Sequence, residues 1–244
     1  MTAIQGSTLL VTGANGGLGT EFVRQALDRG AQRVYATART PRPWTDPRVI
    51  PLTLDVTSSA SIREAASLSS DVTIVINNAG VGGARSPLVE TPMDDVRRLF
   101  ETNVFGALEV AQIYAPILAA NGGGALLDIH SVLSWLARGG TYSATKAALW
   151  SITNSLRLEL RAQGTQVVGA HLGYTDTPLT AWLEGVEKAD PAVIGGTIYD
   201  GLEAGDQEEL AGSVRRGVNA GLVHPPPEPS PHTASRARPV ITSD

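Results

Sequence analysis

The sequence has no cysteine, only two lysines and few aromatic or charged side chains. Its 244 residues include three Phe, four Trp and five Tyr, and charged residues make up 18%. The absence of cysteine excludes disulfides, thiolate metal sites and cysteine nucleophiles. The net charge is −5, and no run of Lys or Arg is longer than two. This balance argues against a nucleic-acid-binding surface.

Long apolar runs and targeting patterns are also missing. The N-terminus lacks the charged and then apolar pattern of a signal peptide, and no stretch of 18 apolar residues occurs. No set of His, Asp and Glu has metal-ligand spacing, so we expect no metal. Hydrophobic residues make up 42%, which is typical of a globular chain of this length. We therefore expect a cytoplasmic protein with neither a membrane nor a nucleic-acid partner.

Short apolar runs alternate with longer segments of 3.6-residue periodicity, without internal repeats. The short runs are rich in Val, Ile and Leu, as is typical of parallel strands that are buried on both faces. The predicted strands are Thr8–Val11, Arg33–Thr37, Val49–Leu54, Val72–Ile76, Ala125–Ile129, Gln166–His171 and Glu208–Ala211. The predicted helices are Leu18–Asp28, Ser59–Leu68, Asp94–Leu118, Tyr142–Arg161, Pro191–Glu203 and Ser213–Ala220. This alternation predicts an α/β fold, a Rossmann-type doubly wound parallel sheet with helices on both faces.

The composition changes near the C-terminus. Five prolines lie between residues 225 and 231, among Ser, Thr and Arg. We therefore predict one domain over residues 1–222 and a Pro-rich, disordered tail over residues 223–244. The alternative for the tail is a proline-rich docking ligand.

A glycine cluster follows the first predicted strand and opens the first predicted helix. Glycines allow a sharp turn and the close approach of a pyrophosphate, whose charge the free N–H groups of the helix favour. No Gly-Lys-Ser/Thr follows, so this is not a nucleoside triphosphate loop. The alternative is a glycine-rich connecting turn. The predicted cofactor-binding residues here are Gly13, Asn15, Gly16, Gly17, Leu18 and Gly19.

Two more turns lie at the same predicted edge of the sheet. The second strand ends without an acidic residue, and Arg39 follows it. A guanidinium suits the 2′-phosphate of NADP, so the sequence favours NADP(H) over NAD(H), unless Arg39 is an ordinary surface arginine. Asn77-Asn78-Ala79-Gly80 follows the fourth strand, at the carboxyl edge where ligands bind.

Tyr142 and Lys146 are four residues apart and share one face of a predicted helix. A free tyrosine ionises near pH 10, and a general acid/base works best when its pKa is near the working pH. A neighbouring ammonium group lowers the pKa of a tyrosine. The pair therefore indicates a proton-transfer site, and the alternative is a surface Tyr–Lys contact.

Taken in order, Thr12-Gly13-x3-Gly17-x-Gly19, Asn77-Asn78-Ala79-Gly80 and Tyr142-x3-Lys146 resemble the short-chain dehydrogenase/reductase family over about residues 6–212. The resemblance implies that Tyr142 donates a proton, Ser131 polarises the substrate carbonyl and Lys146 holds the ribose. It implies that Asn103 holds a water linked to Lys146. It also implies that Tyr142, Lys146, Asp55, Val56, Asn78, Ala79, Gly80, Thr175 and Thr177 contact the cofactor. For Asp55, a strand-end or capping role is the alternative.

The sequence departs from the family pattern at several places. Eleven residues separate Ser131 from Tyr142, where the family commonly has about thirteen, so either the loop is shortened or Ser134 replaces Ser131. Leu172-Gly173 stands where Pro-Gly is usual. Asp128 and His130 occupy strand positions where apolar residues or asparagine are more usual. We interpret His130 and His171 as structural, with a catalytic role as the alternative.

The resemblance implies an NADP(H)-dependent carbonyl reductase or alcohol dehydrogenase. Residues 178–188 carry Leu179, Trp182 and Leu183 with few charges, which favours a hydrophobic ketone or secondary alcohol. The alternatives are a non-catalytic dinucleotide-binding regulatory protein and halohydrin- or epoxide-type lyase chemistry. The resemblance also implies a homodimer built on the two long helices, with a tetramer as the alternative. The family's terminal Asp-Gly-Gly strand, which contributes to the tetramer interface, is missing.

Overall fold

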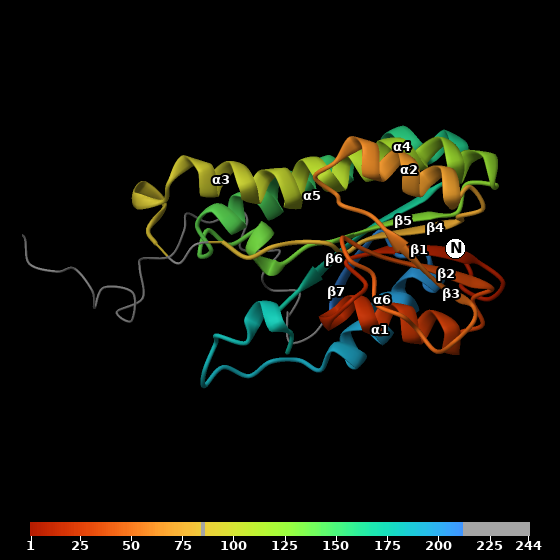
Figure 1. Ribbon diagram of the computed structural model, residues 1–244. Coiled ribbons are helices and arrows are strands. Elements are labelled where there is room, and N and C mark those ends of the chain that lie inside the picture. Colours follow the sequence, from red (N-terminus) through yellow and green to blue (C-terminus); the bar gives the residue numbers. More distant parts are fainter. Residues whose placement is uncertain (84–85, 212–244) are drawn as a thin grey trace, which may run out of the picture.

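The computed structural model describes residues 1–83 and 86–211, which form one sheet with helices on both of its faces (Figure 1). All strand pairs are parallel, in the order β3-β2-β1-β4-β5-β6-β7. The strands are β1 (Thr8–Thr12), β2 (Arg33–Ala38), β3 (Val49–Thr53), β4 (Ile74–Asn77), β5 (Ala125–Ile129), β6 (Gln166–Leu172) and β7 (Glu208–Ala211). The predicted α/β Rossmann fold is confirmed.

The helices form two layers. The α-helices are α1 (Gly17–Asp28), α2 (Ser59–Leu68), α3 (Met93–Phe100), α4 (Ala107–Ala120), α5 (Thr141–Glu159) and α6 (Pro191–Ala204). Shorter turns are η1 (Leu88–Glu90), η2 (Glu101–Gly106), η3 (Val132–Ser134), η4 (Leu160–Gln163) and η5 (Pro178–Thr180). Helices α1 and α6 cover one face, and α2, α4 and α5 cover the other (Figure 1). Each layer buries its own apolar core against the sheet, as this fold requires.

One predicted helix needs correction. The segment predicted as Asp94–Leu118 runs from Met93 to Ala120, and the π-helical turn η2 interrupts it. A Cβ at Gly106 would lie 2.6 Å from the carbonyl oxygen of Val56, so the turn passes close to the neighbouring backbone. Single π-turns inside helices are common at functional sites, and this one carries Asn103.

The other predicted elements differ from the structure mainly at their ends. Strand β4 begins at Ile74 rather than Val72 and continues to Asn77, and β3 ends at Thr53. Helix α5 ends at Glu159, before a turn of 3₁₀ geometry. The predicted helix Ser213–Ala220, the domain boundary at residue 222 and the Pro-rich tail lie outside the described residues.

The strand order reverses between β1 and β4, and this reversal fixes the place of a ligand site. Chain connections leave these two strands in opposite directions, so a crevice opens at their carboxyl ends. The glycine cluster follows β1 and the Asn77–Gly80 turn follows β4. The fold thereby brings both motifs to one edge of the sheet.

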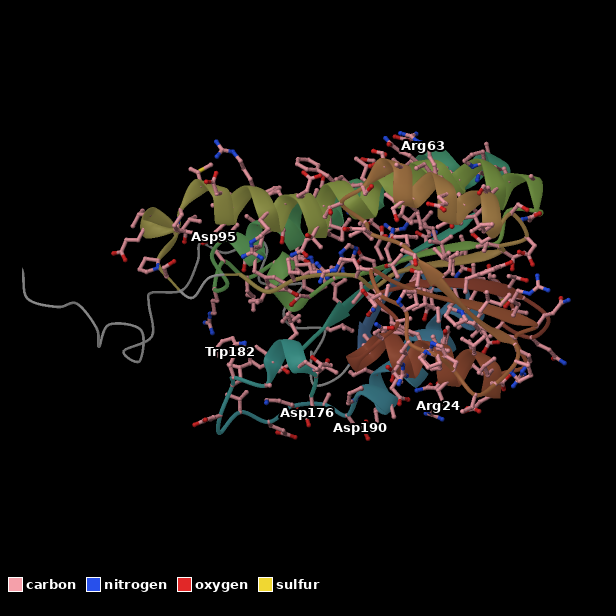
Figure 2. The ribbon with its side chains drawn as sticks, viewed as in Figure 1. Arg24, Arg63, Asp95, Asp176, Trp182 and Asp190 are labelled. Atoms are coloured by element: carbon pink, nitrogen blue, oxygen red, sulfur yellow. The ribbon has the colours of Figure 1, made fainter. Side chains whose placement is uncertain are left out.

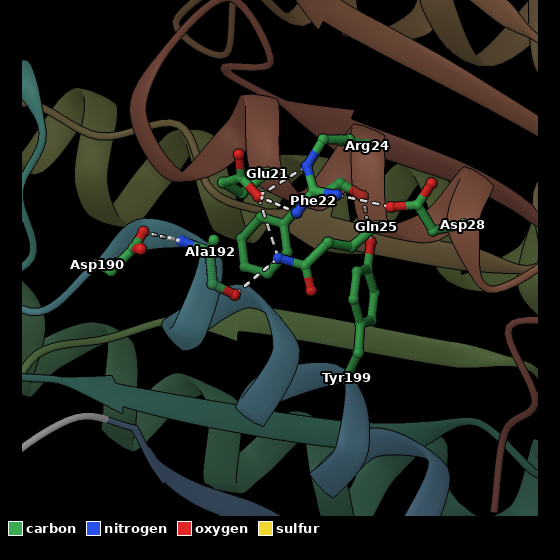
Figure 3. A network of polar contacts seen from close by, with 8 residues as sticks. All are labelled: Glu21, Phe22, Arg24, Gln25, Asp28, Asp190, Ala192 and Tyr199. Carbon is green, nitrogen blue, oxygen red and sulfur yellow. Dashed lines mark hydrogen bonds and ion pairs between the residues drawn. The ribbon is translucent and has the colours of Figure 1, made fainter.

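Polar contacts join α1 to α6 (Figure 3). The Gln25 side chain donates to the Ala192 carbonyl at 2.8 Å, and the Tyr199 hydroxyl donates to the Phe22 carbonyl at 2.8 Å. Asp190 caps α6 by accepting from the Ala192 N–H, as the Asp-Pro start of this helix predicts. The helix that follows the glycine cluster is therefore fixed to the helix that follows residues 173–190.

Among the described residues, one helical run is long and apolar enough to cross a membrane. It is Met93–Ala120, whose most apolar stretch has a mean hydropathy of 1.3 and is 44% buried within the protein. Val110, Tyr114 and Leu118 of this run pack into the core beneath α4. Length and composition are thus weak evidence for a span, because the core helix of a globular domain has the same features.

Candidate active site

The glycine loop between β1 and α1 depends on its glycines for steric reasons. Gly13 and Gly17 have φ of 68° and 53°, a region that favours glycine. A Cβ at Gly19 would lie 2.3 Å from the Gly13 carbonyl oxygen, and one at Gly17 would lie 3.2 Å from the Thr177 side chain. Gly16 faces open space. The loop therefore presents backbone to the carboxyl edge of the sheet.

The N-terminus of α1 is suited to hold an anion. Its N-cap residue is Gly16, which offers no side-chain hydrogen bond, and its first turn has no acidic residue. The first N–H groups of a helix need partners, and the helix dipole favours negative charge there. A cofactor pyrophosphate fits this end of the helix. Leu18 is buried in the core and supports the turn from below.

Hydrogen bonds tie the glycine loop to the turn after β4. The Asn78 side chain donates to the carbonyls of Thr12 and Gly13 at 2.8 and 3.2 Å. The Thr12 hydroxyl accepts from the N–H groups of Asn78 and Ala79 at 3.0 and 2.9 Å. Asn78 therefore shapes the loop, and Ala79 and Gly80 extend from it along the same edge.

The loop after β2 brings two arginines to the glycine loop. Asn15 donates to the Thr40 carbonyl at 2.7 Å and accepts from the Arg42 N–H at 3.1 Å. The Arg42 guanidinium lies 4.0 Å from the centre of the Trp44 ring. Arg39 is exposed and makes no hydrogen bond or ion pair within residues 1–83 and 86–211. Sequence reasoning missed Arg42 and Trp44, although a basic and an aromatic residue two positions apart was a usable signal.

Asp55 shapes the turn after β3. Its carboxylate accepts from the N–H and hydroxyl of Thr57 at 2.9 and 2.7 Å, and these bonds hold its pKa below the usual value. Val56 packs against Gly106 of η2. These contacts agree with the turn-forming alternative for Asp55. The adenine contacts of Asp55 and Val56 stay predictions.

Tyr142 and Lys146 occupy the first two turns of α5, which begins at Thr141. Only 6% of Lys146 is exposed, and its ammonium group donates to the Ile129 carbonyl at 2.6 Å. The same ammonium lies 5.8 Å from the centre of the Tyr142 ring. Helix α5 therefore presents both side chains where β5 ends.

The pKa values of this pair correct one expectation from the sequence. Burial raises the pKa of Tyr142 to about 12, whereas we expected Lys146 to lower it. Burial also lowers the pKa of Lys146 to about 8, and the nearby carboxylate of Asp128 partly offsets this. The Lys146 ammonium donates to the Ile129 carbonyl rather than to the Tyr142 hydroxyl. The protein as described holds Tyr142 protonated at neutral pH.

Ser131 and Asn103 both precede this pair in the chain. Ser131 is the N-cap of η3, and its hydroxyl accepts from the Leu133 N–H at 3.2 Å. The Ser134 hydroxyl, the alternative, is buried without a hydrogen bond to the described residues. Asn103 binds both backbone groups of Val81, and its side chain also donates to the Thr145 hydroxyl at 3.2 Å. Asn103 therefore joins η2 to the start of α5.

Thr175 and Thr177 lie in the segment between β6 and α6. Thr175 is buried and forms a bridge with Ala189, so the two ends of the segment are held together. Thr177 caps η5, and its side chain is the group closest to Gly17 across the crevice. Thr177 thus faces the glycine loop. Within residues 1–83 and 86–211, no cluster of three or more His, Cys, Asp or Glu could hold a metal ion.

Comparison with known proteins agrees with this geometry. The sequence model of the family described as "short chain dehydrogenase" matches residues 7–186. The chain belongs to the short-chain dehydrogenase/reductase family. It is 35% identical over 185 residues to the short-chain dehydrogenase ptmH of Penicillium ochrochloron, which covers 70% of this chain and 66% of that protein. This resemblance spans a little under two thirds of the relative's length.

The similarity to a second relative spans more of that relative's length. Sorbitol dehydrogenase of Cereibacter sphaeroides is 30% identical over 234 residues, with coverage of 90% of this chain and 84% of that protein. Among solved structures, a short-chain dehydrogenase from Burkholderia cenocepacia in complex with NADP superposes with a TM-score of 0.84. It is 32% identical and covers 91% of this chain and 94% of that one. The fold and a dinucleotide-binding oxidoreductase family are thus shown.

The buried histidines generate a prediction about acid stability. Burial lowers the pKa of His171 to about 4, whereas an unfolded histidine has a pKa near 6.5. Between these values only the unfolded chain binds the proton, so the free energy of unfolding falls as pH falls. This contribution is about 1.4 kcal/mol per pH unit. In urea titrations at pH 7, 6 and 5, the His171→Phe variant should lose stability less steeply than the wild type by that amount. Equal slopes would contradict the neutral, buried state of His171.

Proposed function

We propose that this protein is an NADP(H)-dependent carbonyl reductase, equally an alcohol dehydrogenase in the reverse direction. The observation that carries the proposal is the position of Tyr142 and Lys146 at the start of α5, together with Ser131 in the turn that follows β5. This site lies on the same edge of the sheet as the glycine loop. When bound, the dinucleotide supplies the hydride.

The side chains divide the remaining work. The Ser131 hydroxyl donates a hydrogen bond to the substrate carbonyl oxygen, and the Tyr142 hydroxyl gives that oxygen a proton. The phenol is protonated at neutral pH, as the acid in carbonyl reduction must be, and the positive charge of Lys146 favours the phenolate that proton transfer leaves. Lys146 binds the nicotinamide ribose hydroxyls and supplies positive charge beside the phenolate that forms. Asn103 holds the segment after β4 against α5.

The preference for NADP(H) rests on the loop after β2. Arg39 and Arg42 are placed beside the glycine loop, and the Asn15 side chain fixes the backbone between them. The guanidinium fork of arginine matches a phosphate group. The solved relative from Burkholderia cenocepacia contains NADP, one from Sphingobium yanoikuyae contains NADPH, and one from Burkholderia phymatum contains NAD. The two arginines favour the phosphorylated cofactor here.

The substrate is a hydrophobic ketone or secondary alcohol. Trp182 lies on the segment between β6 and α6, opposite the α3 end that carries Asp95 (Figure 2). Leu179 of this segment approaches Gly82, where a Cβ would lie 3.2 Å from its side chain. Exposed apolar side chains also line the segment before and into α3, namely Leu88, Val89 and Met93. Both segments thus present exposed apolar side chains.

The protein acts as a homodimer in this proposal. Phe105 of η2 is 53% exposed and Leu158 of α5 is 72% exposed, on the helices that we expect to pair. Burying such side chains in a second copy is favourable. The mass in solution, measured by light scattering, tests this part. A monomer at micromolar concentration would exclude it.

Cofactor choice is tested by titrating the protein with NADPH and with NADH while nicotinamide fluorescence is recorded. We expect the wild type to bind NADPH at least tenfold more tightly. Arg39→Ala and Arg42→Ala should each weaken NADPH binding by about tenfold, because each removes a charge-assisted contact worth about 1.5–3 kcal/mol, and leave NADH binding unchanged. Arg63→Ala, on the exposed face of α2, is the matched control. If neither nucleotide binds, lyase-type chemistry replaces the proposal.

The role of Tyr142 is tested by Tyr142→Phe with a panel of apolar ketones and NADPH. Loss of the proton donor should lower kcat by about 10²- to 10⁴-fold. NADPH affinity should stay within threefold, because the glycine loop is untouched. Tyr174→Phe, an exposed tyrosine on the β6–α6 segment, is the control and should keep its kcat. If the wild type binds NADPH but reduces no ketone, a non-catalytic dinucleotide-binding protein is the better description.

A further inference from the structure

Four aromatic rings pack together beneath the Ser131 corner. We call them the ring cluster: His130, which follows β5 rather than lying in it as predicted, Trp135 after η3, Trp150 of α5 and His171 of β6. Trp135 stacks on His171 with ring centres 3.9 Å apart and planes inclined by 22°. His130 lies 4.9 Å from His171, and Trp150 meets the Trp135 ring edge-on at 6.0 Å. The His171 ring is therefore enclosed by the other three.

One hydrogen bond connects this cluster to the catalytic serine. Nδ1 of His171 lies 3.3 Å from the carbonyl oxygen of Ser131. A carbonyl oxygen only accepts, so Nδ1 carries the hydrogen and Nε2 does not. Nε2 is buried and has no hydrogen-bond partner among the described residues. The ring is thus a neutral imidazole of one tautomer.

The bond between His171 and Ser131 lies just beyond the last backbone hydrogen bond between the β5 and β6 chains. The last described backbone bond between β5 and β6 at this end runs from the His130 N–H to the Ala170 carbonyl at 2.7 Å. Ser131, the next residue, turns away into η3, and its carbonyl accepts from the Ser134 N–H at 2.9 Å. The second lone pair of that carbonyl faces the His171 side chain. His171 therefore continues the connection between the strands by one residue.

The neighbouring histidine is held by a separate set of contacts. His130 Nε2 lies 3.1 Å from the Thr153 hydroxyl, which lies 2.6 Å from the Asp128 carboxylate. A Cβ at Gly169 would lie 2.9 Å from the His130 ring, so this glycine makes room for it. Asn77 donates to the same carboxylate at 2.9 Å. These contacts fix the His130 ring, and His171 packs against it.

We propose that His171 is a positioning residue for Ser131. Its neutral imidazole, held between Trp135 and His130, fixes the Ser131 backbone through Nδ1 and, through Trp135, the short loop between Ser131 and Tyr142. The proposal rests on the function of Ser131 given above. It accounts for the eleven-residue spacing, because a loop stacked on His171 needs no further residues to reach α5.

Two variants separate the hydrogen bond from the stacking. His171→Phe keeps a ring against Trp135 and removes the donor, while His171→Asn keeps a donor near the Nδ1 position and removes the ring. We expect His171→Phe to lower kcat by about 10- to 100-fold, as small displacements of reacting groups do. NADPH affinity should not change. His171→Asn should retain most of the wild-type kcat and therefore lose much less than His171→Phe. Equal losses in both variants would overturn the proposal.

A double-variant test shows whether His171 acts through Ser131. In a Ser131→Ala background, His171→Phe should cause no further loss of kcat, because the group that it positions is gone. Full, additive losses would overturn the proposal. If Ser131→Ala alone keeps wild-type kcat, the function assigned to Ser131 fails, and a loss in His171→Phe would then mean that the histidine acts elsewhere. Tyr114→Phe, in the core beneath α4, is the packing control and should lower stability without changing kcat.

A measurement without turnover distinguishes this proposal from the proposed function. Nitrogen-15 chemical shifts of the histidine rings report which nitrogen carries the hydrogen. We expect His171 in the Nδ1-protonated neutral form at pH 7, with Nε2 unprotonated. The Nε2-protonated form, or a cationic ring at pH 7, would overturn the positioning role whether or not the protein reduces a ketone.

Discussion

The hydrogen bonds between Thr12 and Asn78 are the contact on which the site depends. They lie where the strand order reverses, between β1 and β4, and they join the two turns that leave these strands. The Thr12 hydroxyl also donates to the Ile76 carbonyl at 3.3 Å, so it is bonded on both sides. Thr12 is buried, and buried backbone and hydroxyl groups need such partners. The glycine loop is therefore held in shape before any ligand binds.

Further hydrogen bonds connect the other parts of the site to this edge of the sheet. Helix α1 leaves the glycine loop, and its seam with α6 places the far end of the β6–α6 segment. Asn103 in the π-turn binds Val81 after β4 and Thr145 beside Lys146. Asn103 thus connects the helix that carries Tyr142 and Lys146 to the turn after β4. Each contact is a buried polar bond with a defined geometry, which is costly to leave unmade.

The sequence could predict the strands, most helices and the motifs, because buried parallel strands and glycine turns have strong local signals. It could not predict contacts that need three dimensions. Nothing near Asn103 indicates a π-turn, in which Gly106 passes close to Val56. The bond from Lys146 to the Ile129 carbonyl, and the burial that raises the pKa of Tyr142, depend on how α5 packs in the fold. The arginine at position 42 was visible in the sequence, but its place beside Asn15 was not.

Several departures from the family pattern are connected in the fold. In the sequence alone nothing relates Asp128, His130, Gly169 and the short loop after Ser131 to one another. In the fold, Asp128 and Gly169 are partners in the register of β5 and β6, and Thr153 of α5 bonds to both Asp128 and His130. The space that Gly169 leaves admits the His130 ring, His171 packs on that ring, and Trp135 of the short loop packs on His171. The short loop between Ser131 and Tyr142 is therefore held in place by the stacking of Trp135 on His171.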